Sequence, residues 1–167
     1  MKSIVQIAVC AAVAAFATNA AAEVIEETPY GVWQFGQNET ACQIQFTSKQ
    51  NAGTGFQFVS RKDGALIFGT RRANDWSTGT EQVPLRATFS RPDGASSTNQ
   101  VTTSKTKTST GWWYNSAVGA SWLDALAASD SLEIVGPNGE GSSFIFVGGN
   151  AAPLDRLAAC SRRWTVD

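Results

Sequence analysis

Short runs of alternating apolar and polar residues cover most of this chain. In the clearest run, Cys42, Ile44 and Phe46 share one face and two glutamines take the other, as expected for a half-buried strand. Similar runs surround Trp33 and Phe56. Further apolar runs lie at 66–68, 83–89, 112–114, 132–135 and 144–147. Turn residues such as those at 63–64, 92–94 and 137–139 separate many of these runs and favour antiparallel hairpins.

The later part of the chain adds two segments with helical spacing. Trp122 to Ala127 is the first, and Pro153 to Ala158 is the second. Pro153 suits the first turn of a helix because its missing N–H has no helical partner there. The pattern predicts a mainly β fold of about eight strands. We expect an antiparallel β-sandwich or partly closed barrel, with two short helices near the C-terminus, forming one domain over residues 23–167.

Three segments give weaker signals. Glu23 to Pro29 is acidic and polar, so we expect a loose arm. The strand around Pro84 is predicted to lie at a sheet edge or to start there, because proline cannot donate to a strand ladder. Residues 96–110 are rich in Ser and Thr and suit either an exposed hairpin or a mobile loop. Their part from Thr102 to Thr110 is an alternative edge for strand addition, although its lysines disfavour such pairing.

The first 22 residues have the features of a secretory signal peptide. Lys2 is followed by an apolar run from Ile4 to Ala17 and by the small residues Ala20 to Ala22. This run is shorter than the ~20 residues of a membrane span, and it continues past Cys10, which disfavours a lipoprotein. We therefore expect a periplasmic or secreted protein with no transmembrane segment in its mature chain.

Two cysteines, Cys42 and Cys160, remain once this leader is removed. Exported cysteine pairs usually oxidise, so the sequence predicts a disulfide bond between them. The bond would tie an early strand to the end of the last helix.

Composition narrows the function. The chain has no histidine and a net charge of −1, which excludes imidazole-dependent catalysis and His-ligated metal sites. The balanced charge gives no basic surface for nucleic acid. We expect no cofactor and no metal, and we do not expect an enzyme.

Trp112, Trp113 and Tyr114 form the most suggestive cluster. In a strand, Trp112 and Tyr114 point to one face and Trp113 to the other. Exposed rings of this kind stack on sugars or anchor proteins, so the three residues are a candidate ligand-binding site, with core packing as the alternative. Asp124 and Asp130 are a weaker candidate, as a carboxylate pair for glycoside hydrolysis.

The order of the predicted elements resembles the invasion-associated locus B family of secreted Gram-negative proteins. The resemblance rests on Trp33 in the first strand, on 42–44, on Leu85-Arg86, and on the helix 122–127. It continues with the strand 132–134 and with the closing strand and helix over 144–157. It implies a periplasmic or surface-associated β-sandwich linked to host interaction, and it carries over no catalytic residues.

The sequence therefore predicts a secreted, non-enzymatic protein that binds a protein or glycan at the cell envelope. An inhibitor of a secreted hydrolase, such as a protease or lysozyme, is the first alternative. A carboxylate-based glycan hydrolase is the second.

Overall fold

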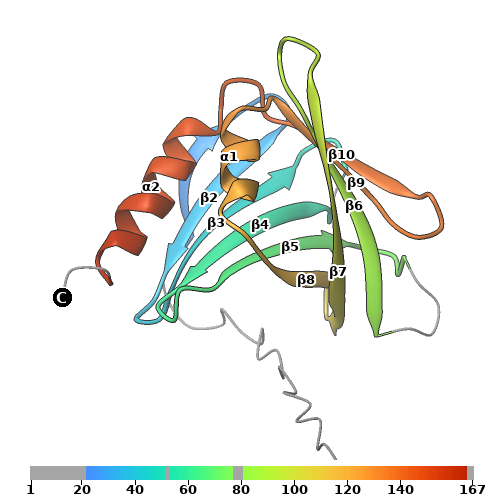
Figure 1. The fold of residues 1–167 in the computed structure, drawn as a ribbon, viewed down its shortest axis with the longest axis horizontal. Coiled ribbons are helices and arrows are strands. Elements are labelled where there is room, and N and C mark those ends of the chain that lie inside the picture. Colours follow the sequence, from blue (N-terminus) through green and yellow to red (C-terminus); the bar gives the residue numbers. More distant parts are fainter. Residues whose placement is uncertain (1–21, 52, 77–80, 165–167) are drawn as a thin grey trace, which may run out of the picture.

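Ten antiparallel strands form a single sheet in the computed structural model, which describes residues 22–51, 53–76 and 81–164 (Figure 1). The strands lie side by side in the order β1-β2-β3-β4-β5-β8-β7-β6-β9-β10. Their bounds are β1 Glu23–Glu27, β2 Gly31–Gln37, β3 Ala41–Ser48, β4 Gly55–Arg61, β5 Leu66–Arg72, β6 Gln82–Ser90, β7 Ser96–Thr108, β8 Gly111–Val118, β9 Ser131–Val135 and β10 Gly141–Ile145. The helices are α1 Ser121–Ala127 and α2 Ala151–Arg162.

The sheet folds over so that its last strand packs against its first ones. The Phe144 ring of β10 lies 5.2 Å from the ring of Phe56, and Phe146 lies 5.9 Å from Trp33. All four side chains are almost completely buried. Contact between the two ends of the sheet confirms the predicted mainly antiparallel fold, a sandwich or partly closed barrel. We call the face turned to this core the inner face and the opposite face the outer face.

The bend of the sheet coincides with a change of partner along β7. Residues Ser96 to Ser104 pair with β6, and Ser104 to Thr108 pair with β8. Thr103, next to this point, is buried, and its hydroxyl donates to the Val83 carbonyl at 2.8 Å. The segment expected to be a hairpin or mobile loop is thus mainly one long strand. The part from Ser104 to Thr108 pairs with β8 along one of its two edges.

The expected loose arm at Glu23 to Pro29 is wrong, because Glu23–Glu27 form β1 and pair with β2. An edge strand with both faces largely exposed needs no apolar alternation, so its sequence carried no strand signal. Its ladder with β2 and the packing of Ile25 against the core hold it in place, and two exposed ion pairs add to this: Glu27 pairs with Lys49 at 2.6 Å, and Glu23 pairs with Arg156 of α2. With β1 and β7 included, the sheet has ten strands rather than eight.

The strand around Pro84 is not at the edge of the sheet, because β6 lies between β7 and β9. However, β9 pairs only with Arg86 to Ser90. Pro84 is the third residue of β6 and precedes this ladder, so its missing N–H costs no hydrogen bond to β9.

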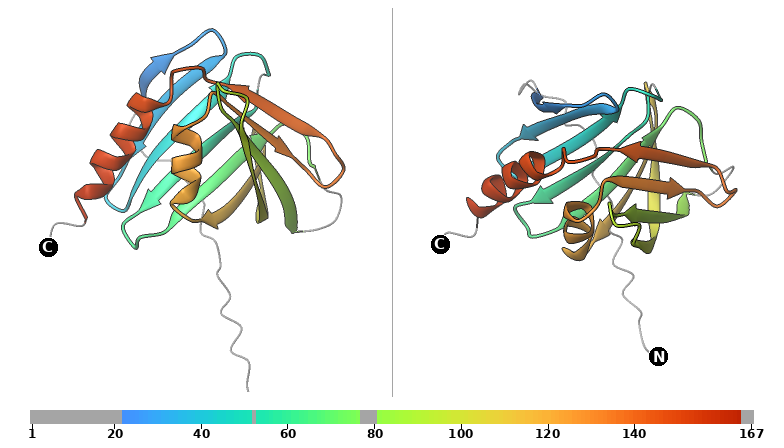
Figure 2. Two further views of the ribbon diagram at one scale, coloured as in Figure 1. Left: turned by 45° about the horizontal axis from the view of Figure 1, so that its top comes forward. Right: turned by 90° about the horizontal axis from the view of Figure 1, so that it is seen from above.

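Both helices lie on the inner side of the folded sheet (Figure 2). Trp122 of α1 packs on Phe68 at 4.9 Å between ring centroids, and α2 buries Leu157 and Cys160. Cys160 forms a disulfide bond with Cys42 of β3, with a Cα–Cα distance of 6.1 Å, which confirms the predicted pairing. Neither helix of the described residues combines the length and the apolar character that crossing a membrane requires. The predicted leader lies outside the described residues except for Ala22.

We expect the disulfide to contribute substantially to stability, because its cysteines are 118 positions apart in the chain. Closing a loop of that size restricts the unfolded chain and is worth roughly 2–5 kcal/mol. Replacing both residues, Cys42→Ala with Cys160→Ala, should lower the free energy of unfolding by such an amount in urea titrations. An unchanged urea midpoint, or two free thiols in non-reducing mass spectrometry of the wild-type protein, would contradict this expectation.

Candidate functional site

The three aromatic residues of β8 divide between the two faces of the sheet as strand alternation requires. Thr70 of β5 lies opposite Tyr114, Arg71 opposite Trp113 and Arg72 opposite Trp112. Tyr114 is 0 % exposed and belongs to the core, whereas both tryptophans are partly exposed. Trp112 and Tyr114 therefore share the inner face, and Trp113 lies on the outer face.

Tyr114 anchors the segment that follows β5. Its hydroxyl donates to Asp75 Oδ1 at 2.7 Å and accepts from the Trp76 backbone N–H at 2.7 Å. The other oxygen of Asp75 binds Lys105 Nζ at 2.8 Å. Burial raises the pKa of Tyr114 to about 12, and the Asp75 carboxylate adds to that effect against the opposing Trp76 N–H. The phenol is thus neutral at physiological pH, and its role is structural.

Trp112 lies on the inner face, where it packs against the hydrophobic core. Lys105 and Lys107 of β7 approach its ring, with their ammonium nitrogens 4.9 Å and 5.8 Å from the ring centroid. Cation–π contacts of this kind hold the ring in place. Trp112 therefore closes the core at this end of β8.

Trp113 is the aromatic residue of the cluster that faces outward. The guanidinium of its cross-strand partner Arg71 lies 6.0 Å from its ring centroid, and Thr106 of β7 is its partner on the other side. Trp113 is absent from the buried core cluster. It is the partly exposed ring that the sequence pattern predicted on one side of this strand.

A row of amide side chains crosses the outer face beside Trp113. Strand pairing places Gln34, Gln45, Gln57, Gly69 and Asn115 opposite one another on five successive strands, from β2 to β8. We call these five residues the amide row. The sequence pattern does not predict this row, because its members are far apart in the chain. Gln45, one of the two glutamines on the polar side of β3, is the part of it that the pattern shows.

Within the amide row, the side chains of Asn115 and Gln57 approach each other at Gly69. A methyl group on residue 69 would lie 2.4 Å from Asn115 Oδ1 and 3.0 Å from Gln57 Nε2. Gln57 is 6 % exposed and accepts from Gln43 Nε2 at 2.9 Å. Asn115 is 7 % exposed, and its Oδ1 has no hydrogen-bond partner within the described residues. A buried unpaired acceptor costs free energy, so a ligand donor that reached this oxygen would relieve that cost.

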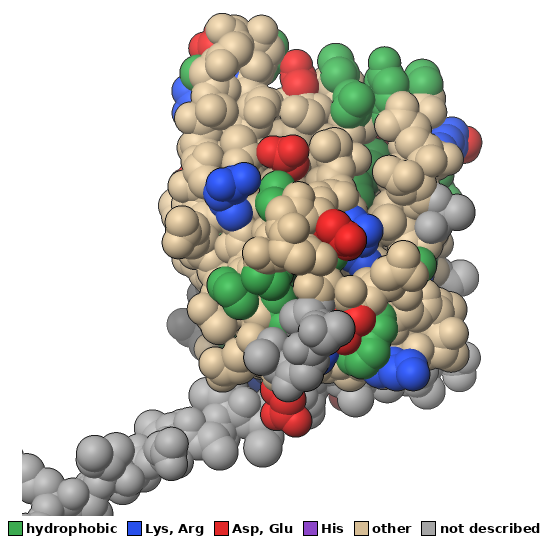
Figure 3. Space-filling model, turned by 90° about the vertical axis from the view of Figure 1, so that its right-hand side faces the viewer, with side chains coloured by type: hydrophobic (Ala, Val, Ile, Leu, Met, Phe, Trp, Pro, Cys, Tyr) green, Lys and Arg blue, Asp and Glu red, His purple; other side chains and the backbone are tan. Residues whose placement is uncertain are grey.

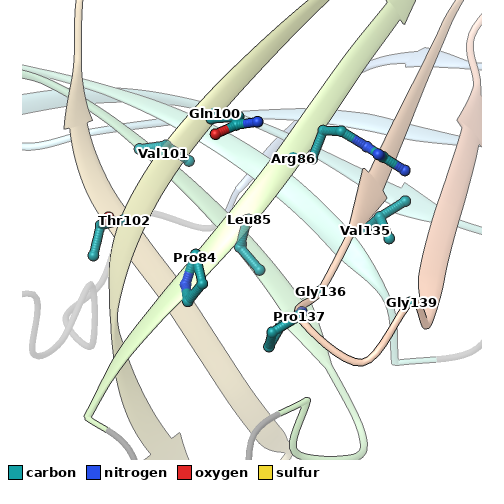
Figure 4. Close-up of a pocket in the computed structure, with 10 residues that line it drawn as sticks. All are labelled: Pro84, Leu85, Arg86, Gln100, Val101, Thr102, Val135, Gly136, Pro137 and Gly139. Carbon is teal, nitrogen blue, oxygen red and sulfur yellow. The ribbon is translucent and has the colours of Figure 1, made fainter.

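A second surface feature is a shallow groove of about 470 Å³ on the outer face of β6 and β7 (Figure 4). Pro84 and Arg86 of β6, Gln100 and Thr102 of β7, and Pro137 of the β9–β10 turn contribute to it. Among the described residues that line it, Arg86 alone is charged. The face shown in Figure 3 carries isolated charged side chains among polar ones, with no continuous basic surface.

The carboxylate candidates lie near the end of α1. Asp124 is exposed on the helix. Asp130 follows in the loop before β9, where its backbone pairs with Ser90 and Phe146 and its Oδ1 accepts weakly from the Gly148 N–H at 3.4 Å. These contacts give Asp130 a role in joining β6, β9 and β10. Among the described residues, no three acidic or cysteine side chains gather where they could hold a metal ion.

No protein-family model matches this chain, and neither a curated protein nor a solved structure matches it. The resemblance to the invasion-associated locus B family stays a prediction.

We expect Tyr114→Phe to lower stability and to change its dependence on alkaline pH. The substitution removes a buried hydrogen-bond partner, which costs about 1–3 kcal/mol. Tyr114 has a pKa near 12 in the folded protein against 10.0 ordinarily, so its contribution is complete below pH 10 and is lost as pH rises toward 12. The difference in unfolding free energy between wild type and variant should therefore shrink over that range. A difference independent of pH would contradict the assignment.

The two tryptophans should differ in their effect on stability. Trp112→Ala removes a ring that packs against the core and should cost about 2 kcal/mol or more. Trp113→Ala removes an outer cross-strand pair, worth below about 1 kcal/mol. Chemical denaturation of both variants measures the difference. Equal losses would show that Trp113 is as much a part of the core as Trp112.

Proposed function

We propose that this protein is exported to the periplasm or cell surface and acts there, without catalysis, by binding a protein or glycan of the cell envelope. Trp113 is the observation that carries this proposal. A large aromatic side chain kept partly exposed on a sheet face contributes less to folding than a buried one, and such rings commonly anchor ligands. Arg71 and the amide row surround it with hydrogen-bonding groups.

The chemistry of the rest of the chain supports binding rather than catalysis. The chain has no histidine, its two cysteines outside the predicted leader are bonded to each other, and Tyr114 is held neutral in the core. A base or nucleophile would have to come from a carboxylate, a lysine or a hydroxyl group. The resemblance to the invasion-associated locus B family adds a role in host interaction to this proposal.

An inhibitor of a secreted hydrolase is a second candidate, favoured by one feature. The β6–β7 hairpin projects from the body of the sheet (Figure 1), and its turn from Arg91 to Ala95 is exposed. The turn is held by paired backbone groups, with Gly94 at a φ of +84°. A rigid projecting turn is the kind of element that enters an active-site cleft.

Affinity capture from envelope extract tests the main proposal. The oxidised wild-type protein should retain a partner, and Trp113→Ala should retain much less of it because the exposed ring is lost. Arg86→Gln, which changes a charged residue in the separate groove of β6, is the matched control and should capture as the wild type does.

Two outcomes would redirect the proposal. Equal capture by wild type and Trp113→Ala would contradict a binding site at this ring. Alternatively, the protein could capture a hydrolase in stoichiometric amounts and inhibit it. If shortening the turn from Arg91 to Ala95 abolished that capture, the protein would be identified as an inhibitor.

A further inference from the structure

We infer that the outer face around Trp113, Gly69 and Asn115 binds a glycan whose sugar rings carry carboxylate groups. This inference rests on the proposed binding function and names its ligand class. Three independent features of the outer face carry it: the charge of the strands, the unpaired amide oxygen, and the spacing between the ring and the amides.

The charged residues of the central strands are all positive. Strands β2 to β8 contain no Asp or Glu, whereas they contain six Lys and Arg residues, of which Arg61, Arg71 and Arg86 lie on the outer face. The acidic residues of the described chain lie instead in β1, β9, the helices and the connecting segments. On the outer face, Arg71 stands beside Trp113 with its Nε donating to the Gly53 carbonyl at 3.1 Å. A guanidinium held in this way is suited to a carboxylate, and the surrounding strands offer nothing that would repel one.

The amides supply hydrogen bonds of both kinds. Asn115 is more than nine-tenths buried, and its Oδ1 has no hydrogen-bond partner in the part of the chain that the structure describes. This oxygen lies beside Gly69 and near the Gln57 amide. Sugar hydroxyls both donate and accept, so one hydroxyl group can pair with two amides at once. Gly69 is essential to this arrangement because any larger side chain would occupy the space where the two amides meet.

Trp113 and Asn115 are two residues apart on β8, so their side chains are neighbours on the same face. A sugar ring stacked on Trp113 would extend its hydroxyls over Gly69 and Asn115, while Arg71 lies on the adjoining strand. Successive members of the amide row are about 4.8 Å apart, the distance between neighbouring strands. A glycan chain running across these strands would cross the partly exposed side chains of Gln34 and Gln45 as well as the gap at Gly69.

A matched pair of oligosaccharides tests the inference on the purified oxidised protein by isothermal titration calorimetry. The first probe is a hexamer of galacturonic acid, and the second is the same hexamer with every carboxylate methyl-esterified. The acid form should bind roughly tenfold more tightly than the ester. Arg71→Gln should remove that preference, and Arg86→Gln should leave it intact.

Variants of the amide row separate binding from stability. Asn115→Ala should weaken binding of both hexamers severalfold without lowering the melting temperature, because it removes an unpaired buried acceptor. Gly69→Ala should weaken binding too, since its methyl group displaces the Asn115 amide. Trp113→Ala should reduce both affinities roughly tenfold or more.

The inference would be overturned by equal affinity for the acid and ester hexamers, by no binding of either one, or by tighter binding of a single-stranded oligonucleotide. Envelope capture distinguishes this failure from failure of the proposed function. If capture still depends on Trp113 while neither hexamer binds, the binding function stands and the glycan is wrong. If capture is also independent of Trp113, both are wrong.

Discussion

The contact of Phe144 and Phe146 with the rings of Trp33, Phe46 and Phe56 determines how the rest of the molecule is built. It joins the two ends of one ten-stranded sheet across a shared core. Most strands therefore use one face for packing and leave the other toward solvent. The helices fill the remaining inner space, and the disulfide fixes α2 to β3. Function at the sheet is thereby confined to its outer face and to its ends.

On that outer face, an aromatic ring, a guanidinium and two amides lie close together. Trp113, Arg71, Gln57 and Asn115 lie together because pairing of β4, β5 and β8 brings them into adjoining positions. The unpaired Asn115 oxygen is a cost to folding that the protein retains. An arrangement of an aromatic ring, a guanidinium and converging amides, free of carboxylates, is complementary to a hydroxyl-rich anionic ligand.

Local patterns predicted much of the fold and little of the site. Apolar and polar residues alternate from Cys42 to Phe46 because one face of this strand is buried, so the sequence predicted the strand correctly. β1 was missed because this short edge strand packs only Ile25 against the core and shows no apolar alternation. β7 was not predicted as one strand because its residues are nearly all polar. Trp113 was a candidate from alternation alone. The amide row was not, because Gln57, Gly69 and Asn115 become neighbours only through the pairing of distant strands.

Residue-by-residue mapping of the bound ligand tests the central claim most directly. In a titration of ¹⁵N-labelled protein with the galacturonic acid hexamer, followed by two-dimensional NMR, we expect the largest shift changes at the Trp113 indole, the Asn115 and Gln57 side-chain amides, and the Gly69 backbone. Changes that instead centre on the groove at Pro84 and Arg86, or on the inner-face residue Trp112, would contradict a binding site on the outer face of β4, β5 and β8.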